Sequence, residues 1–304
     1  MKAVLQTQSG PPEVLTFAEV DRPVPREREL LIRVHAATVA MGDVMLRKLP
    51  RILLHVVGAF VGFKPKIIAG VEFAGEVIAV GDGVTRFCVG DRVFGTTTGL
   101  RTGAYAEYLC IPEQWKLGVV MKIPAPLSYE NAATLPVGGM TALQLLRRAG
   151  VKAGQRVLVY GASGSVGTYA VQLAVQMGAT VTGVCSAANL ELVRSLGAAS
   201  AIDYTREDFA GMGAKYDVVF DAAGKISRSR AKPVLAPGAR YVSVKSPTKE
   251  VLEELEQLAV LAAKGLIKPV VDRRYTLDQV VEAHRYVESR RKRGNVIIRI
   301  VEGV

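Results

Sequence analysis

A glycine-rich turn at residues 161–167 constrains the fold of this chain more than any other stretch. The apolar run Val157 to Tyr160 stops at the sequence Gly161-Ala162-Ser163-Gly164-Ser165-Val166-Gly167. A segment with helical spacing of apolar residues follows up to Gly178, and a second apolar run covers Thr180 to Cys185. This order of strand, tight turn, helix and strand within about 30 residues predicts a βαβ unit.

Each glycine of such a unit has a separate task. Gly161 permits the sharp turn, Gly164 lets the backbone approach a pyrophosphate, and Gly167 lets the helix pack closely on the strand. The N–H groups at the start of the helix then bind the phosphates. The pattern therefore predicts a dinucleotide site, and the alternative is a glycine-rich turn without a ligand.

The composition is that of a compact globular protein. With 304 residues, 49% of them hydrophobic and 22% charged, the chain can form one large or two ordinary domains. Three cysteines, Cys88, Cys110 and Cys185, lack the paired spacing of a disulfide framework or a metal knuckle. This favours a reducing compartment, and because no signal-peptide core follows Met1, we expect a cytoplasmic protein.

Two local segments have alternative interpretations. The net charge is +11, and its densest cluster is Arg290-Arg291-Lys292-Arg293, which we interpret as a solvated last helical turn stopped by Gly294. Binding of nucleic acid or a phosphorylated ligand is the alternative. The apolar run Ile52 to Phe63 is too short to span a bilayer, which needs about 20 residues, so we expect a buried helix, or else an apolar lid over a substrate pocket.

The pattern of secondary structure changes twice along the chain. Short strands with glycine turns up to residue 125 predict a mostly antiparallel, partly open barrel. Ser128 resembles a helix start, Gly138-Gly139 suggests a break between two helices, and strands alternate with helices from Val151 to about Lys264, which predicts a parallel α/β sheet. We expect the tail to return to the first domain, which gives the boundaries 1–125, 126–264 and 265–304.

Several motifs occur in an order that resembles a known family. They are Ala36-Ala37-Thr38 with Gly42-Asp43, Gly70-Val71-Glu72-Phe73-Ala74-Gly75, Val89 to Gly95, Leu135 to Ala142, Val157 to Gly167, Tyr216 to Asp221, and Ala283-His284-Arg285-Tyr286. Together they resemble the zinc-independent quinone oxidoreductases (zeta-crystallin-like) of the medium-chain dehydrogenases/reductases, over nearly the whole chain.

The resemblance implies an α/β protein with a GroES-like β-rich catalytic domain, a Rossmann domain with a doubly wound parallel sheet, and an active site in the cleft between them. Zinc-dependent relatives bind the metal through Cys and His, but this chain has Ala40, Met41 and Gly42 before Asp43, and no histidine in the Gly70 motif. A Cys₂His zinc site is not supported, and we interpret His35, His55 and His284 as structural.

The residue at the end of the second strand of the βαβ unit indicates which dinucleotide is bound. An acidic residue there would bind the ribose of NAD, whereas this chain has Ser186, 19 positions beyond Gly167. A 2′-phosphate would meet no carboxylate, so NADP is favoured, although Ala188 stands where relatives commonly carry a basic residue. By resemblance, the cofactor-binding residues are Gly161, Ser163, Gly164, Ser165, Val166, Gly167, Ser186, Asn189, Tyr204, Ala223 and Gly224.

The resemblance implies hydride transfer from NADPH to a quinone or α,β-unsaturated carbonyl without metal. Met41, Asp43 and Thr141 are the candidates for the nicotinamide pocket by family match. Asp43 has an equal alternative as the N-cap of a helix over Val44 to Arg47. A nucleic-acid-binding protein and a cofactor-binding regulatory or structural protein on the same fold are the alternatives from other classes.

The chain also departs from the family between Arg240 and Leu261. Relatives place two strands and an intervening helical stretch there, whereas this chain has one strand-like run, Arg240 to Val244, before a helix near Glu250. We expect one strand of the usual six to be missing, leaving about five. Because the last strand pairs across the dimer axis in relatives, we expect a monomer or a dimer through another surface.

Overall fold

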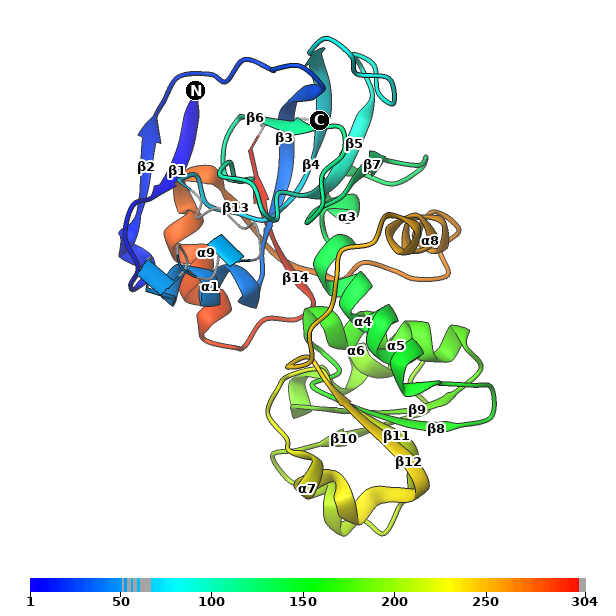
Figure 1. Ribbon diagram of the computed structural model, residues 1–304. Coiled ribbons are helices and arrows are strands. Elements are labelled where there is room, and N and C mark those ends of the chain that lie inside the picture. The colour runs from blue at the N-terminus through cyan, green and yellow to red at the C-terminus, as the bar shows by residue number, and fades with distance from the viewer. Residues whose placement is uncertain (51, 54–55, 57–58, 61–66, 301–304) are drawn as a thin grey trace. The chain divides into compact units, whose positions relative to one another are not determined.

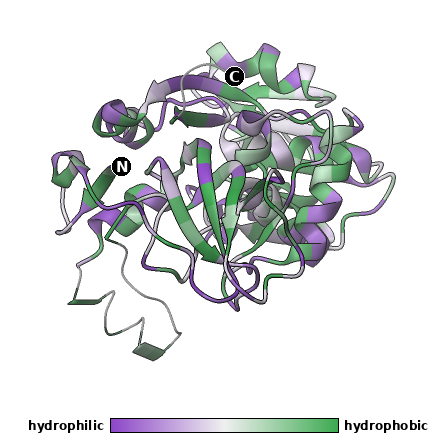
Figure 2. Cartoon of the chain, turned by 90° about the horizontal axis from the view of Figure 1, so that it is seen from above, coloured by the Kyte–Doolittle hydropathy of each residue, from purple (hydrophilic) through white to green (hydrophobic). Residues whose placement is uncertain are grey.

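The computed structural model describes residues 1–50, 52–53, 56, 59–60 and 67–300, and these form two compact units. The first unit comprises Met1–Val137, Glu250–Ala259 and Val271–Val304, and the second comprises Gly138–Lys249 and Val260–Val270. Helices and strands mix hydrophobic and hydrophilic residues along their length, as expected for elements with one buried face (Figure 2).

The first unit is rich in antiparallel strands (Figure 1). Its strands are β1 (Lys2–Gln6), β2 (Leu15–Glu19), β3 (Glu29–Val39), β4 (Glu72–Val80), β5 (Arg92–Thr96), β6 (Tyr108–Pro112), β7 (Val120–Lys122), β13 (Val271–Thr276) and β14 (Asn295–Arg299). The larger sheet has the order β13-β14-β3-β4-β5-β7, with β6 also paired to β3, while β1 and β2 pair with each other.

The strands of the tail belong to this larger sheet. Strand β14 pairs with β3 antiparallel, and β13 pairs with β14 in parallel. The helices whose residues lie mainly in this unit are α1 (Met41–Lys48), α3 (Tyr129–Ala133), α8 (Leu252–Ala263) and α9 (Val280–Glu288). Helix α9 contacts α1 and β14, and its buried Val280, Ala283 and Val287 join the hydrophobic core of the sheet.

The second unit is a parallel sheet with the order β10-β9-β8-β11-β12. Its strands are β8 (Arg156–Tyr160), β9 (Thr180–Cys185), β10 (Ser200–Asp203), β11 (Tyr216–Asp221) and β12 (Leu235–Ser243). Its helices are α4 (Pro136–Ala149, from its third residue on), α5 (Ser165–Gln176), α6 (Leu190–Ser195) and α7 (Arg228–Ala231). The prediction of a sheet with five strands is confirmed over this fully described stretch, and β12 is an edge strand.

Three expectations from the sequence are wrong. Gly138 and Gly139 lie inside α4, and the break between helices falls at Thr134 and Leu135 instead. Gly138 is needed for close packing, because a Cβ built there would lie 2.6 Å from the Ser165 hydroxyl. The start at Ser128 is confirmed, since its hydroxyl accepts a hydrogen bond from the Asn131 N–H.

The basic cluster does not form a last helical turn. Helix α9 already ends at Glu288, and Arg290 adopts a left-handed conformation with φ 59°, so the chain leaves the helix before Gly294. The Lys292 ammonium donates a hydrogen bond to the Gly294 carbonyl.

The third wrong expectation is that the segment Ile52 to Phe63 is buried, although its described residues are helical. Its described members are exposed, with Ile52 at 78% and Phe60 at 88%. Among the residues that the structure describes, no apolar face covers these side chains. Residues 54–55, 57–58 and 61–63 lie outside the described part.

Candidate dinucleotide site and the buried polar cluster

The turn between β8 and α5 has the conformation predicted for Gly161 and the close packing predicted for Gly167. Gly161 has φ 78°, which only glycine adopts readily. A Cβ on Gly167 would lie 2.1 Å from the Gly161 carbonyl oxygen, so only glycine permits this close packing of helix and turn. Gly164 is the N-cap of α5 with an ordinary φ of −80°.

Gly164 leaves the space that a phosphate would need. A Cβ built there would approach one described atom within 4 Å, the Gly161 carbonyl oxygen at 3.5 Å. As N-cap it has no side chain to bond the first N–H groups of α5, which have no carbonyl partners within the helix. Ser165, Val166 and Gly167 form this first turn, so their backbone fits an anion at the helix N-terminus.

Two serines and an asparagine meet beside this turn. Ser163 lies in the turn, and Ser186 follows the last residue of β9. The Asn189 side-chain Nδ2 donates hydrogen bonds to both hydroxyls, with distances of 3.2 Å to Ser163 Oγ and 3.1 Å to Ser186 Oγ. Asn189 is fixed in turn by its own N–H, which donates to the Ser186 carbonyl at 2.9 Å.

The remaining predicted cofactor residues follow β10, which pairs with β9, and β11, which pairs with β8. Tyr204 comes directly after β10, is 53% exposed, and lies with its ring centroid 6.3 Å from that of Tyr160. Ala223 and Gly224 follow β11, and a Cβ on Gly161 would lie 2.8 Å from the Ala223 Cβ. The structure thus gathers these residues at the carboxyl ends of parallel strands, where α/β sheets bind ligands.

Asp221 organises the loop of Ala223 and Gly224, a role that the sequence did not reveal. It is fully buried at the end of β11 and accepts hydrogen bonds from the N–H groups of Ala223, Lys225 and Ile226 and from the Ser243 hydroxyl. The sequence feature that could have indicated this role is the carboxylate of Asp221 directly after the apolar run Val218 to Phe220. We interpret it as the residue that holds this loop in shape.

The predicted catalytic residues are divided between the units. Met41 is the first residue of α1 and packs partly buried against the hydrophobic core, and Thr141 lies half-buried in α4 of the second unit. Asp43 is buried and accepts a hydrogen bond from the Ala40 N–H at 2.8 Å. It is therefore the third residue of α1, and the alternative that made it the N-cap is wrong because Ala40 occupies that position.

Near Asp43 lies a buried carboxyl, that of Glu72 in the Gly70 motif, whose role the sequence did not reveal. Glu72 accepts hydrogen bonds from the Thr38 hydroxyl and from the Val137 N–H, the latter at 2.7 Å. Burial, as the main cause, raises the pKa of the Glu72 carboxyl to about 7, and the negative charge of Asp43 contributes. Glu72 therefore titrates near neutral pH within the first unit.

Replacing Glu72 by glutamine should stabilise the protein at alkaline pH. The unfolded carboxyl ionises above its ordinary pKa of 4.5, while the folded one resists ionisation up to about 7, so folding loses stability as pH rises between these values. The glutamine amide can keep both hydrogen bonds without a charge, because its oxygen can accept from Val137 and its NH₂ group can donate to the Thr38 hydroxyl. We expect the free energy of unfolding to rise by about 3 kcal/mol at pH 8.5 and hardly at all at pH 4, as measured by urea unfolding. A gain that does not change with pH would contradict the assignment.

A second buried cluster joins α1 to α9. The fully buried Arg47 donates hydrogen bonds to the Gly10 carbonyl at 3.1 Å, to His284 Nδ1 at 2.9 Å and to the Glu288 carboxylate at 2.7 Å. Burial, helped by the positive charge of Arg47, lowers the pKa of His284 to about 3, so the imidazole stays neutral and can accept this bond. The cluster anchors the helix that carries Met41 and Asp43.

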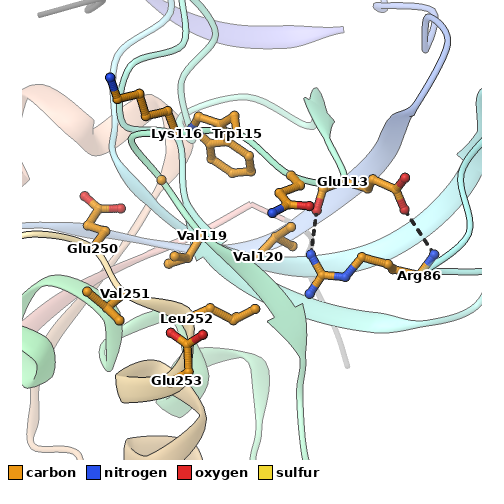
Figure 3. Close-up of a pocket in the computed structure, with 12 residues that line it drawn as sticks. Arg86, Glu113, Trp115, Lys116, Val119, Val120, Glu250, Val251, Leu252 and Glu253 are labelled. Carbon is orange, nitrogen blue, oxygen red and sulfur yellow. Dashed lines mark hydrogen bonds between the residues drawn. The ribbon is translucent and has the colours of Figure 1, made fainter.

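The first unit also contains a hollow of about 240 Å³ between the segment around β7 and the start of α8. Figure 3 shows Trp115, Val119, Val120 and Leu252 around it. Two of its acidic groups have partners: Glu113 accepts from Arg28 and from the Arg86 N–H, and Glu250 accepts from the hydroxyls of Thr96 and Thr98. It includes none of the predicted site residues.

Fold and site together define a two-unit dehydrogenase with one dinucleotide-binding unit. Residues 26–125 match the alcohol dehydrogenase GroES-like domain, and residues 165–267 and 246–298 match zinc-binding dehydrogenase families.

No group of three or more His, Cys, Asp or Glu side chains in the described part of the chain could hold a metal ion, so these residues do not fit a zinc centre. No described helix is long and apolar enough to span a membrane.

Comparison with known proteins shows which family of dehydrogenases the chain resembles. The chain is 33% identical to the 2-methylene-furan-3-one reductase of Solanum lycopersicum, over 98% of this chain and 79% of the relative. It is 31% identical to the chloroplastic NADPH-dependent alkenal/one oxidoreductase of Arabidopsis thaliana, with the same coverage. The quinone oxidoreductase structure from Coxiella burnetii superimposes with a TM-score of 0.83 at 30% identity, over 99% of both chains. The chain belongs to the quinone oxidoreductase family of the medium-chain dehydrogenases/reductases.

Proposed function

We propose that this protein is an NADPH-dependent oxidoreductase that reduces a quinone or an α,β-unsaturated carbonyl without a metal ion. The observation that carries the proposal is the first turn of α5, which can bind an anion, next to the segment Ser186 to Asn189 after β9, whose own side chains offer hydroxyl and amide groups and no carboxylate. The names of the relatives, which include an alkenal/one oxidoreductase and a quinone oxidoreductase, support the same substrate class.

The bound nicotinamide would supply a hydride, which quinones and enones accept at a conjugated position. The chain's own task is to bind the phosphates on the first turn of α5 and to hold the adenosine end beside Ser163, Ser186 and Tyr204. Met41, Asp43 and Thr141 are proposed to shape the nicotinamide pocket and to exclude water from it. Water can protonate the reduced substrate, so no acidic side chain is required.

The test is a screen of small quinones, enones and aldehydes, with NADPH oxidation followed by absorbance. We expect turnover with quinones or enones, and little with saturated aldehydes. NADPH binding without turnover of any acceptor would instead favour a cofactor-binding regulatory protein. Retention on RNA that falls with salt would favour the nucleic-acid alternative, which has no support from the relatives named above.

Introducing aspartate at Ser186 should reverse the cofactor preference. The wild-type protein should prefer NADPH modestly, because Ser186 replaces an acidic ribose ligand while Ala188 brings no positive charge. The introduced carboxylate would repel the 2′-phosphate and accept hydrogen bonds from the ribose hydroxyls of NADH. The ratio of kcat/KM for the two cofactors measures this, and equal values in the wild type would contradict the assignment.

Chelators should leave activity unchanged. By resemblance, Ala40, Met41 and Gly42 stand where zinc-dependent relatives would offer a first cysteine ligand, and the Gly70 motif lacks histidine. We expect the same turnover with and without EDTA, and a zinc content far below one ion per chain. Stoichiometric zinc together with loss of turnover on chelation would contradict a metal-independent reaction.

We further propose a monomer, or a dimer formed through a surface other than the edge of the parallel sheet. The parallel sheet has five strands, and by resemblance we infer that the missing strand is the one that pairs across the dimer axis in relatives; Lys245 and Lys249 follow the edge strand β12. Light scattering gives the mass. The cytoplasmic location and the boundaries 1–125, 126–264 and 265–304 stay predictions.

A further inference from the structure

We propose that Asn189 acts as the positioning residue for NADPH selectivity by turning the hydroxyl hydrogens of Ser163 and Ser186 toward the 2′-phosphate. The inference rests on the proposed use of NADPH and assigns its selectivity to a side chain that need not touch the cofactor. Asn189 is 8% exposed, and its Oδ1 atom is buried.

The direction of the hydrogen bonds carries the argument. A serine hydroxyl has one hydrogen to donate and two lone pairs, whereas an amide NH₂ can only donate. Because Asn189 Nδ2 donates to both Oγ atoms, neither serine can point its own hydrogen at this nitrogen. Both hydrogens must therefore find acceptors elsewhere.

The orientation of the amide follows from the groups that it leaves unpaired. With Nδ2 toward the serines, the only unpaired amide atom in the described structure is the acceptor Oδ1. The reverse orientation would place the NH₂ group there and leave two donors unpaired at that position. The orientation with Nδ2 toward the serines therefore has the smaller desolvation cost and is the one assigned.

Two oriented donors suit a phosphate better than a ribose hydroxyl. Both oxygens lie within hydrogen-bonding distance of the same nitrogen, so the two serines can reach different oxygens of one phosphate group. Hydrogen bonds to a charged acceptor are stronger than those to a neutral one. This pair therefore supplies part of the anion binding that Ala188, without a charge, does not.

The test is the isosteric change Asn189→Asp. A carboxylate accepts where the amide donated, so both serine hydrogens would turn inward and a negative charge would stand behind them. Titration calorimetry gives the affinities for adenosine 2′,5′-bisphosphate and for 5′-AMP. Their ratio is the contribution of the 2′-phosphate to binding, and it is measured without turnover. We expect affinity for the bisphosphate to fall roughly 100-fold, while that for 5′-AMP stays unchanged.

Two further variants separate positioning from structure. Asn189→Ala lets the two serine hydroxyls rotate freely. It should lower the affinity for the bisphosphate only about 5-fold. Asn131→Asp, which adds the same charge in α3, should change neither affinity. If Asn189→Asp fails to fold, the double variant Ser163→Ala/Ser186→Ala must lose the discrimination instead.

The outcomes distinguish this inference from the proposed function. Equal weakening of both ligands by Asn189→Asp, or an unchanged ratio, would overturn the positioning role even if the enzyme reduces quinones. A selective loss of the bisphosphate in a protein that reduces no acceptor would support the positioning role and overturn the proposed reaction.

Discussion

Replacing Gly164 by valine is expected to weaken NADPH binding roughly 1,000-fold while leaving the fold intact. The residue has an ordinary φ of −80°, and a Cβ there would make one ordinary van der Waals contact, at 3.5 Å with the Gly161 carbonyl oxygen, so the space beside it accepts a side chain. That space is where a phosphate would approach the first turn of α5. Losing two hydrogen bonds to a charged group, at about 2 kcal/mol each, corresponds to roughly 1,000-fold weaker binding.

The control for this variant is Gly211→Val in the same unit. A Cβ on Gly211 meets nothing within 4 Å, and the residue lies at the end of a short 3₁₀ helix, Phe209–Gly211. Both variants should unfold within a few degrees of the wild type, because valine is a poor N-cap but costs only about 1 kcal/mol. Unchanged NADPH affinity in Gly164→Val, measured by nicotinamide fluorescence, would exclude the proposed phosphate position.

Replacing Arg47 by leucine is expected to destabilise the first unit by about 3 to 5 kcal/mol. The change removes the donor for three acceptors at once, including the buried His284 ring, whose Nδ1 would then have lost its hydrogen bond. Because Arg47 lies on α1, the helix that carries Met41 and Asp43 would lose its anchor to α9.

A matched control for Arg47 is Arg33→Leu. Arg33 also pairs with a glutamate, Glu76, at 2.7 Å, but its side chain is 42% exposed. Exposed pairs contribute little because water screens them, so we expect a loss below about 1 kcal/mol. Urea unfolding of both variants at pH 7 decides the matter, and equal losses would mean that the buried cluster contributes no more than a surface pair.

The local features of the dinucleotide unit could be predicted from the sequence because their causes are local. A positive φ at Gly161 and the close packing at Gly167 depend on a few neighbouring residues, and so does the alternation of strands and helices. The short connection after β12 likewise shows in the sequence as a missing apolar run, which is why five strands could be predicted.

The polar clusters could not be predicted, because their partners are far apart in the chain. Arg47 and His284 are separated by 237 positions, and neither residue type indicates a mutual contact in advance. Glu72 belongs to a family motif, but its hydrogen bond with Thr38 depends on how β3 and β4 pair. The helix break predicted at Gly138-Gly139 was wrong because a glycine pair usually ends a helix. Here Gly138 lies inside α4 and permits the close approach of α5.

The measurement that tests the central claim most directly is a single turnover with NADPH that carries deuterium at C4 of the nicotinamide. The protein is treated with EDTA, mixed with a small enone and the labelled NADPH, and the product is analysed by NMR. We expect deuterium from one face of the nicotinamide at the conjugated carbon of the product, with one NADPH consumed for each product formed. NADPH oxidation without deuterium at that carbon from either face, or no oxidation with any quinone or enone, would contradict metal-independent hydride transfer by this protein.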